Sequence, residues 1–269
     1  MKQFALCLLV VLLAACAGRE ARLETATTIA QRGNLRSVTV TSQPFTLAAF
    51  VRSIDPTAPV TVYIEGDGLA WISRSQPSTD PTPTNPIGLK LAALDASPNV
   101  VYLARPCQYA WSPACSETYW TDRRFAEEVV AATSSAIDRL IRPGQRIHLV
   151  GYSGGGAVAA LVAARRHDVV SLRTVAGNLD HAEVNRIHRV SPMNGSLNAA
   201  DMASALVSLP QLHLVGGQDD VVPVAIAESY AGRAGDRRCV VIRVIPEATH
   251  ASGWTDIWQT VVGQIPACR

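Results

Sequence analysis

Three residues in the second half of the chain have the types and the order that serine-based acyl transfer requires. Ser153 lies in Gly151-Tyr152-Ser153-Gly154-Gly155, Asp219 lies in a Gly-Gly-x-Asp-Asp loop, and His250 follows both. A serine hydroxyl is a poor nucleophile until a histidine accepts its proton, and a carboxylate holds that histidine in the needed tautomer. The order therefore predicts attack by Ser153, with His250 as base and Asp219 as its acid partner.

The sequence around Ser153 is more informative than the motif alone. A bare Gly-x-Ser-x-Gly match arises by chance in about one chain in ten, but here a predicted buried strand, 147–150, leads in and a small-residue helix, 157–165, leads out. A strained turn between strand and helix is the setting that such a nucleophile needs. In this respect the chain resembles the α/β-hydrolase superfamily, from about Val60 to the C-terminus. A phosphate-binding loop, the alternative for this glycine-rich motif, is disfavoured because the lysine that such loops place before Ser or Thr is missing.

The resemblance implies the chain order nucleophile, acid, histidine. The predicted strand 211–215 runs into the acid loop, where the family's aspartate stands four residues before a proline; Pro223 therefore selects Asp219, with Asp220 as the alternative. Of six histidines, only His250 lies late enough to follow the acid loop and a further strand. We expect structural or surface roles for the other five.

The resemblance also implies two backbone donors for the oxyanion. Gly154 follows the nucleophile, and Asp67 lies in the loop after the predicted strand 59–64. Many relatives have His-Gly where this chain has Glu65-Gly66. A carboxylate beside a developing oxyanion would slow the reaction unless it points away or is paired, and Arg74 and Arg105 are the candidate partners. Asp67 could instead bind substrate or serve the structure.

The elements that position these residues alternate between strand and helix. This pattern predicts an α/β fold: a doubly wound, mostly parallel sheet with helices on both faces and an antiparallel N-terminal hairpin. We expect strands at 37–42, 45–52, 59–64, 99–104, 146–150, 169–175, 211–215 and 239–245. We expect helices at 87–95, 121–141 with Thr121 as N-cap, 154–166, 224–231 and 254–265. The Pro-rich stretch 71–86 is predicted to be a loop.

The N-terminus predicts export. A short charged start and the apolar run Phe4–Ala15 indicate a signal peptide, residues 1–15, which is too short to span a membrane. Leu13-Ala14-Ala15-Cys16 resembles the lipobox of bacterial lipoproteins, which implies a lipid on Cys16, and Ala17 favours the outer membrane. An ordinary signal peptide is the alternative. Residues 16–35 are predicted to be a tether, although Ala21–Ile29 could form a short helix, and 36–269 the catalytic domain.

Four cysteines remain for the folded domain: Cys107, Cys115, Cys239 and Cys268. An even number in an exported protein indicates disulfides. Three pairings are possible, and proximity favours Cys107 with Cys115 and Cys239 with Cys268. A zinc site is disfavoured because the chain has no Cys-x-x-Cys pair and no histidine at ligand spacing.

Composition narrows the partners and the function. The formal charge of +2, with scattered Lys and Arg, predicts no nucleic-acid binding. No metal or organic cofactor is implied, and the oligomeric state stays open. The aromatic residues of two loops (Trp71, Tyr109, Trp111, Tyr119, Trp120) indicate either an apolar substrate pocket or packing around a disulfide. We expect hydrolysis of small-molecule or lipid carboxylic esters; a peptidase, an acyltransferase and a non-catalytic envelope lipoprotein are the alternatives.

Overall fold

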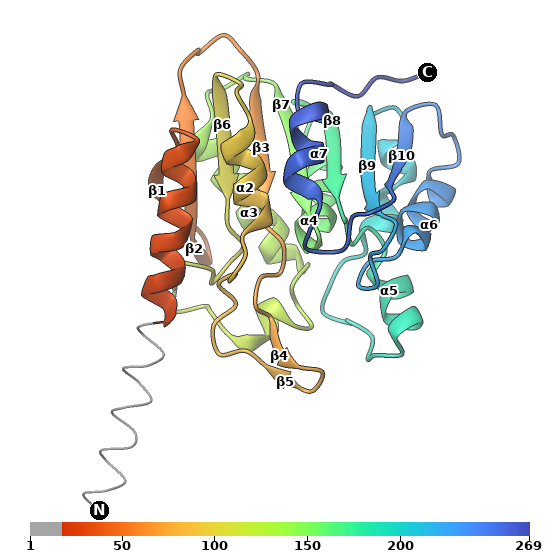
Figure 1. Cartoon of the computed structure of the whole chain (residues 1–269), viewed down its shortest axis with the longest axis horizontal. Helices are drawn as coiled ribbons and strands as arrows, with labels where there is room; N and C mark the ends of the chain where they lie inside the picture. Colours follow the sequence, from red (N-terminus) through yellow and green to blue (C-terminus); the bar gives the residue numbers. More distant parts are fainter. Residues whose placement is uncertain (1–17) are drawn as a thin grey trace, which may run out of the picture.

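A computed structural model describes residues 18–269, built around one eight-stranded sheet (Figure 1). The predicted signal peptide and Cys16 lie outside the described residues. The sheet strands are β1 (Arg36–Ser42), β2 (Phe45–Ser53), β3 (Val60–Ile64), β6 (Asn99–Leu103), β7 (Ile147–Tyr152), β8 (Val169–Val175), β9 (Gln211–Gly216) and β10 (Val240–Ile245). A separate short hairpin pairs β4 (Trp71–Ser73) with β5 (Gln76–Pro77).

The strand order is β1-β2-β6-β3-β7-β8-β9-β10. β2 pairs antiparallel with β1 and β6, and every pair from β6 to β10 is parallel. All residues of β3 and β6 are buried, as expected for central strands covered on both faces. The predicted fold class, including the N-terminal hairpin, is confirmed.

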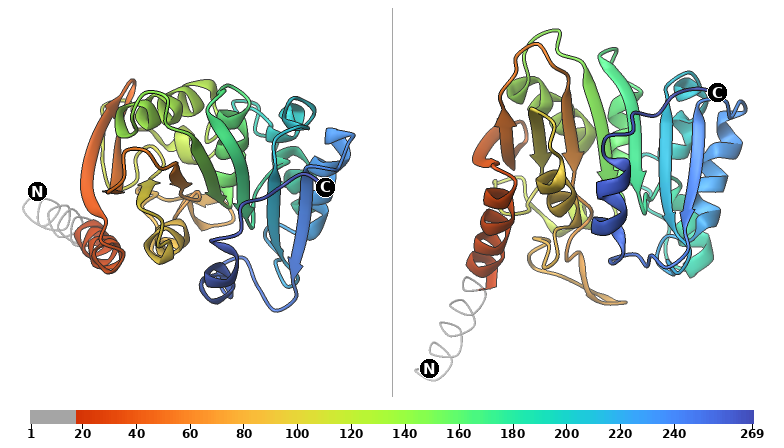
Figure 2. Two further views of the ribbon diagram at one scale, coloured as in Figure 1. Left: turned by 90° about the horizontal axis from the view of Figure 1, so that it is seen from above. Right: turned by 45° about the horizontal axis from the view of Figure 1, so that its top comes forward.

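Helices cover both faces of this sheet (Figure 2). The labelled α-helices are α2 (Ile87–Leu94), α3 (Glu127–Leu140), α4 (Gly154–Ala163), α5 (His181–His188), α6 (Val224–Ala234) and α7 (Trp254–Val261). Short 3-10 helices span Glu117–Trp120, Ala199–Met202 and Ser204–Leu206. Residues of α3, α4 and α6 belong to one apolar cluster, and those of α2 and α7 belong to the cluster on the other face. Among the described residues, no helix is long and apolar enough to cross a membrane.

A helix at 18–32 occupies most of the segment predicted to be a tether. Ala26 and Ala30 are buried in the same cluster as Phe50 of β2 and Leu91 of α2. The small alanine side chains allow the helix to approach the body closely. This helix is thus part of the domain's packing, and the tethering role of 16–35 stays a prediction.

The helix predicted to start at Thr121 begins instead at Glu127, so that boundary was wrong. Thr121 does not cap it: its hydroxyl donates to the Glu117 carbonyl within the preceding 3-10 helix. Residues 121–126 form turns that end in extended backbone at Ala126. Burial of Phe125 in the core and pairing of Arg124 with Asp67 outweigh the local helical pattern.

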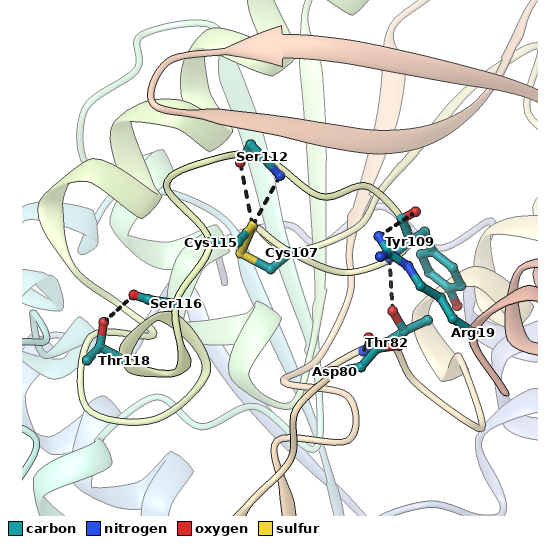
Figure 3. The surroundings of a disulfide bond; sticks show 9 residues. All are labelled: Arg19, Asp80, Thr82, Cys107, Tyr109, Ser112, Cys115, Ser116 and Thr118. Carbon is teal, nitrogen blue, oxygen red and sulfur yellow. Dashed lines mark hydrogen bonds between the residues drawn. A yellow bond between two sulfur atoms is a disulfide. The ribbon is translucent and has the colours of Figure 1, made fainter. Parts of the chain in front are cut away.

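Both predicted disulfides are present in the structure. Cys107 is bonded to Cys115 within one loop (Figure 3), and Cys239 is bonded to Cys268 near the C-terminus. Ser112 contacts the Cys115 sulfur through its backbone N–H and its hydroxyl, so the smaller loop is internally bonded. No group of three or more His, Cys, Asp or Glu suited to a metal ion occurs within 18–269.

Candidate active site

Ser153 lies at the turn between β7 and α4 and has a positive φ, with φ 50° and ψ −122°. A non-glycine residue in this conformation is strained, and the surroundings must hold it there. The Ser153 N–H donates to the Val175 carbonyl of β8, and the Ser153 carbonyl accepts from the N–H groups of Gly156 and Asn178. A Cβ at Gly151 would lie 2.3 Å from the Gly155 carbonyl oxygen, so the turn requires glycine there.

Ser153, His250 and Asp219 form one chain of hydrogen bonds. Ser153 Oγ lies 3.0 Å from His250 Nε2, and His250 Nδ1 lies 2.9 Å from Asp219 Oδ2. When Nδ1 carries the proton and donates to Asp219, Nε2 is free to accept the Ser153 proton. The three residues follow β7, β9 and β10, so the carboxyl ends of parallel strands bring them together.

The geometry distinguishes Asp219 from its neighbour. The Asp219 side chain is fully buried, and its second oxygen, Oδ1, accepts from the backbone N–H groups of Val221 and Val222 at 2.9 and 2.8 Å. These bonds hold the carboxylate facing His250. Asp220 is exposed and makes no hydrogen bond or ion pair with His250.

Two residues that the sequence did not single out hold the His250 backbone. The Tyr152 hydroxyl and the Trp254 indole N–H both donate to the His250 carbonyl, at 3.0 and 2.9 Å. The Tyr152 ring also lies 5.6 Å from the imidazole. Burial raises the pKa of Tyr152, so its hydroxyl stays protonated and able to donate. In the sequence, Tyr152 is notable only as the variable position of the Gly-x-Ser-x-Gly motif.

The loop after β3 is held by the buried carboxylate of Glu65. Its oxygens accept from the N–H groups of Gly66, Gly88 and Leu89 at 2.9, 3.1 and 3.2 Å, and from the Tyr102 hydroxyl at 3.1 Å. Burial raises the pKa of Glu65, while these bonds act against that shift. Glu65 therefore ties the loop to the start of α2.

The Asp67 carboxylate is paired with two arginines. Oδ1 lies 3.1 Å from Arg105 Nη1, and Oδ2 lies 3.0 Å from Arg124 Nη1. Arg105 was an expected partner; Arg124 was missed because 121–141 was predicted to be one helix, and Arg74 makes no ion pair with Asp67. The carboxylate lies so close to Gly154 that a Cβ there would be 2.0 Å from Oδ1. Burial lowers the pKa of Arg105, and the Asp67 charge opposes that change.

A cavity of 560 Å³ lies over Ser153 and His250. A second cavity of 740 Å³ shares Trp71, Arg124 and Val221 with it, so the two adjoin. The apolar side chains around the second cavity are Trp71, Val190, Pro192, Met193 and Val221. The first cavity contains Ser153 and His250, and the second has room for an apolar group next to them.

Of the aromatic residues expected over the site, Trp71 is the one that lines these cavities. Trp111 packs against Trp120 with ring centres 6.0 Å apart, and Tyr119 packs edge-on against Phe45. Trp111, Trp120 and Tyr119 therefore serve the packing of the loops, which was the alternative to a substrate pocket. Among the other histidines, His148 and His213 bond to hydroxyls within the sheet, those of Ser171 and Thr174.

No protein-family model and no curated protein matches the sequence. Solved structures are similar in fold. An esterase of Pyrococcus furiosus has a TM-score of 0.61 and 12% identity, with 86% of this chain and 89% of that chain covered. Est1E from Butyrivibrio proteoclasticus has a TM-score of 0.57 and 14% identity, with 84% and 95% covered. A bacterial membrane phospholipase A has a TM-score of 0.56 and 19% identity, with 97% of each chain covered.

At such identities the similarity defines the fold alone. These neighbours belong to the α/β-hydrolase superfamily, and the chain has the α/β-hydrolase fold. The function must be argued from the site.

Proposed function

We propose that this chain is an exported, lipid-anchored serine hydrolase that cleaves carboxylic esters. Ser153 is the nucleophile, His250 the base and Asp219 its acid partner. The observation that carries the proposal is the unbroken hydrogen-bond chain from Ser153 through His250 to Asp219, with lengths of 3.0 and 2.9 Å. Structural neighbours named as esterases and a phospholipase support the same class.

The geometry suggests a two-step acyl transfer. Ser153 Oγ bonds to the ester carbonyl carbon as His250 Nε2 takes its proton, and the carbonyl π electrons move to oxygen. Collapse of this intermediate breaks the bond to the alcohol, which leaves with the proton from His250. Water, deprotonated by His250, then attacks the acyl carbon. Collapse of this second intermediate breaks the bond to Ser153 Oγ, which takes the proton back from His250 as the acid leaves. Asp219 stabilises the charged imidazole.

The Gly154 and Asp67 N–H groups are the proposed donors to the oxyanion. Gly154 is the first residue of α4, where an N–H has no partner within the helix and the helix dipole favours negative charge. Among the described residues, no acceptor bonds to the Asp67 N–H. The two arginines offset the Asp67 carboxylate, which would otherwise repel the oxyanion.

The predicted signal peptide and Cys16 support attachment to the cell envelope, at the outer membrane and facing the periplasm or the exterior. The adjoining apolar cavity supports an acyl group of modest length from a small-molecule or lipid ester.

Ester turnover tests this proposal. We expect the wild type to hydrolyse p-nitrophenyl butyrate, and Ser153→Ala and His250→Ala to lower kcat by about a thousandfold or more. His167→Ala is the matched control, because His167 is exposed and outside the site. A folded wild type without turnover on an ester panel, or full activity of Ser153→Ala, would refute the proposal.

A further inference from the structure

Exposed apolar side chains border the mouth of the candidate site. Trp71, Val190 and Val221 line its cavities and are 41 to 49% exposed, and Ile72, next to Trp71 on β4, is 57% exposed. Trp111 does not line these cavities, but it is also exposed and packs against Trp120, whose indole N–H donates to the Ser78 carbonyl at the base of the β4–β5 hairpin. We call these five residues, Trp71, Ile72, Trp111, Val190 and Val221, the apolar rim.

The N-terminal helix begins at the same edge of the molecule as the apolar rim. Figure 1 shows its first turn at the lower edge, from which β4 and β5 also project. Arg22 donates to the Thr82 carbonyl and pairs with Asp80. Arg19 donates to the Tyr109 carbonyl (Figure 3). The Arg19 guanidinium also lies 5.6 Å from the Trp111 ring centre. The start of the helix is therefore bonded to the loops beside the site.

The predicted lipid attachment site lies close to the start of the N-terminal helix in the sequence. The apolar run Phe4–Ala15 and Cys16 come immediately before Gly18, where the described helix begins. Two residues of chain extend at most about 7 Å. A lipid on Cys16 would therefore keep the first turn of the helix close to the bilayer surface. Arg19 and Arg22 attach that turn to the loops beside the site.

We propose that the apolar rim docks against the lipid bilayer, so that the site mouth faces the membrane and receives ester substrates from it. The proposal rests on the proposed lipid anchor and deepens the proposed ester hydrolysis by naming membrane-resident lipid esters as the substrate class. Tryptophan side chains favour the membrane interface because they have an apolar ring and a polar N–H. Residues Trp71 and Trp111 are both exposed on this edge, whereas Trp120, Trp254 and Trp258 are buried.

Because only two of the five tryptophans are exposed, quenching of tryptophan fluorescence by brominated lipids can test the docking directly. The processed full chain is reconstituted into vesicles of phosphatidylcholine and phosphatidylglycerol at about 3:1, with or without brominated acyl chains. Bromine quenches tryptophan fluorescence only at short range. We expect quenching in the wild type, and its loss in Trp71→Phe/Trp111→Phe, which keeps the rim apolar but removes the two exposed indoles.

A second pair of variants tests the rim without changing a tryptophan. Ile72→Asp adds a charge at the rim, and we expect it to reduce quenching by about half or more. Ile54→Asp is the matched control, because Ile54 is 71% exposed and lies in the loop between β2 and β3. Figure 1 shows this loop at the opposite end of the strands from β4 and β5, so quenching should not change.

Three outcomes would overturn the docking: no flotation of the full chain with the vesicles, no quenching of the bound chain, or quenching that persists in Trp71→Phe/Trp111→Phe. The readout needs no turnover, so it separates this proposal from the hydrolase proposal. Quenching without hydrolysis of p-nitrophenyl butyrate would contradict only the proposed activity. Hydrolysis by a vesicle-bound chain without quenching would contradict only the docking.

Discussion

Asp219 and Asp220 are adjacent and chemically alike, but only Asp219 is hydrogen-bonded to His250. We expect Asp219→Asn to lower kcat for ester hydrolysis by about a thousandfold or more, because an amide does not stabilise the charged imidazole or fix its tautomer. Asp220→Asn should leave kcat nearly unchanged, which makes it the matched control. The opposite ranking of the two variants would show that the acid has been assigned to the wrong residue.

The pairing of Asp67 predicts a charge effect at the oxyanion. Arg105→Met removes one of its two cations, and we expect kcat to fall by about tenfold because a less compensated carboxylate then lies beside the Gly154 donor. Adding Asp67→Asn to this variant should restore part of the activity, since a neutral amide needs no counter-charge.

Arg139→Met is the control for this series, because Arg139 is exposed in the last turn of α3, away from the site, and makes no ion pair with Asp67. Steady-state kinetics, with circular dichroism to verify folding, measures the set. Equal losses for Arg139→Met and Arg105→Met would contradict the charge argument.

At the scale of residues, local signals determined what the sequence could predict. Ser153 had a strand-turn-helix motif, Asp219 had a proline four residues later, and His250 had its place after the last strand; the structure brings all three within hydrogen-bond reach. Arg124 and Trp254 had no such signal. Arg124 acts through a contact with Asp67, 57 positions away, and such pairs cannot be read from one sequence.

The strand and helix pattern predicted most elements of the fold. Buried β-branched runs such as β3 and β6 have an unambiguous local preference. The predicted start of α3 was wrong. Residues 121–126 lie in the sequence between two helical segments, but tertiary contacts of Arg124 and Phe125 hold them in turns. The β4–β5 hairpin was missed because its two short strands lie in a Pro-rich stretch without alternation.

The disulfide loop is expected to affect catalysis as well as stability. Arg105 and Gln108 flank Cys107, and Gln108 Nε2 donates to the Gly66 carbonyl at 3.0 Å, so the loop holds the backbone next to Asp67. Cys107→Ser/Cys115→Ser should lower both the free energy of unfolding, by about 2.5 kcal/mol, and kcat.

Cys239→Ser/Cys268→Ser is the comparison, because this bond ties the C-terminus to the body. It should lower the free energy of unfolding by about 3.5 kcal/mol and leave kcat unchanged. Urea unfolding and ester turnover measure the two effects. If only the C-terminal pair altered kcat, the loop would not have this role.

Across the whole molecule, a buried histidine makes stability depend on pH. Burial lowers the pKa of His213 from 6.5 to about 3. The unfolded chain therefore binds a proton between these values that the folded chain does not, and stability is present above pH 6.5 and lost as the pH falls toward 3. We expect His213→Gln to remove up to about 1.4 kcal/mol per pH unit from this slope.

Urea unfolding at several pH values between 4 and 7 measures that slope. His167→Gln is the control, because the exposed His167 should not alter it. An unchanged slope in His213→Gln would mean that His213 takes up its proton over the same pH range in the folded and the unfolded chain.

The alternation of strands and helices predicted the fold class, but the sheet order could not be read from it. Placing β6 between β2 and β3 depends on which buried faces fit together, and one sequence does not show this. The same applies to the helix at 18–32: its two buried alanines indicate no partner until the cluster with Phe50 and Leu91 is seen.

The claim that Ser153 is an activated nucleophile is tested most directly by covalent labelling with a fluorophosphonate probe, followed by mapping of the modified peptide. We predict that the folded wild type is labelled on Ser153, and that Ser153→Ala and His250→Ala are not labelled. A folded wild type that stays unlabelled, or that is labelled on another residue, would contradict the proposed mechanism.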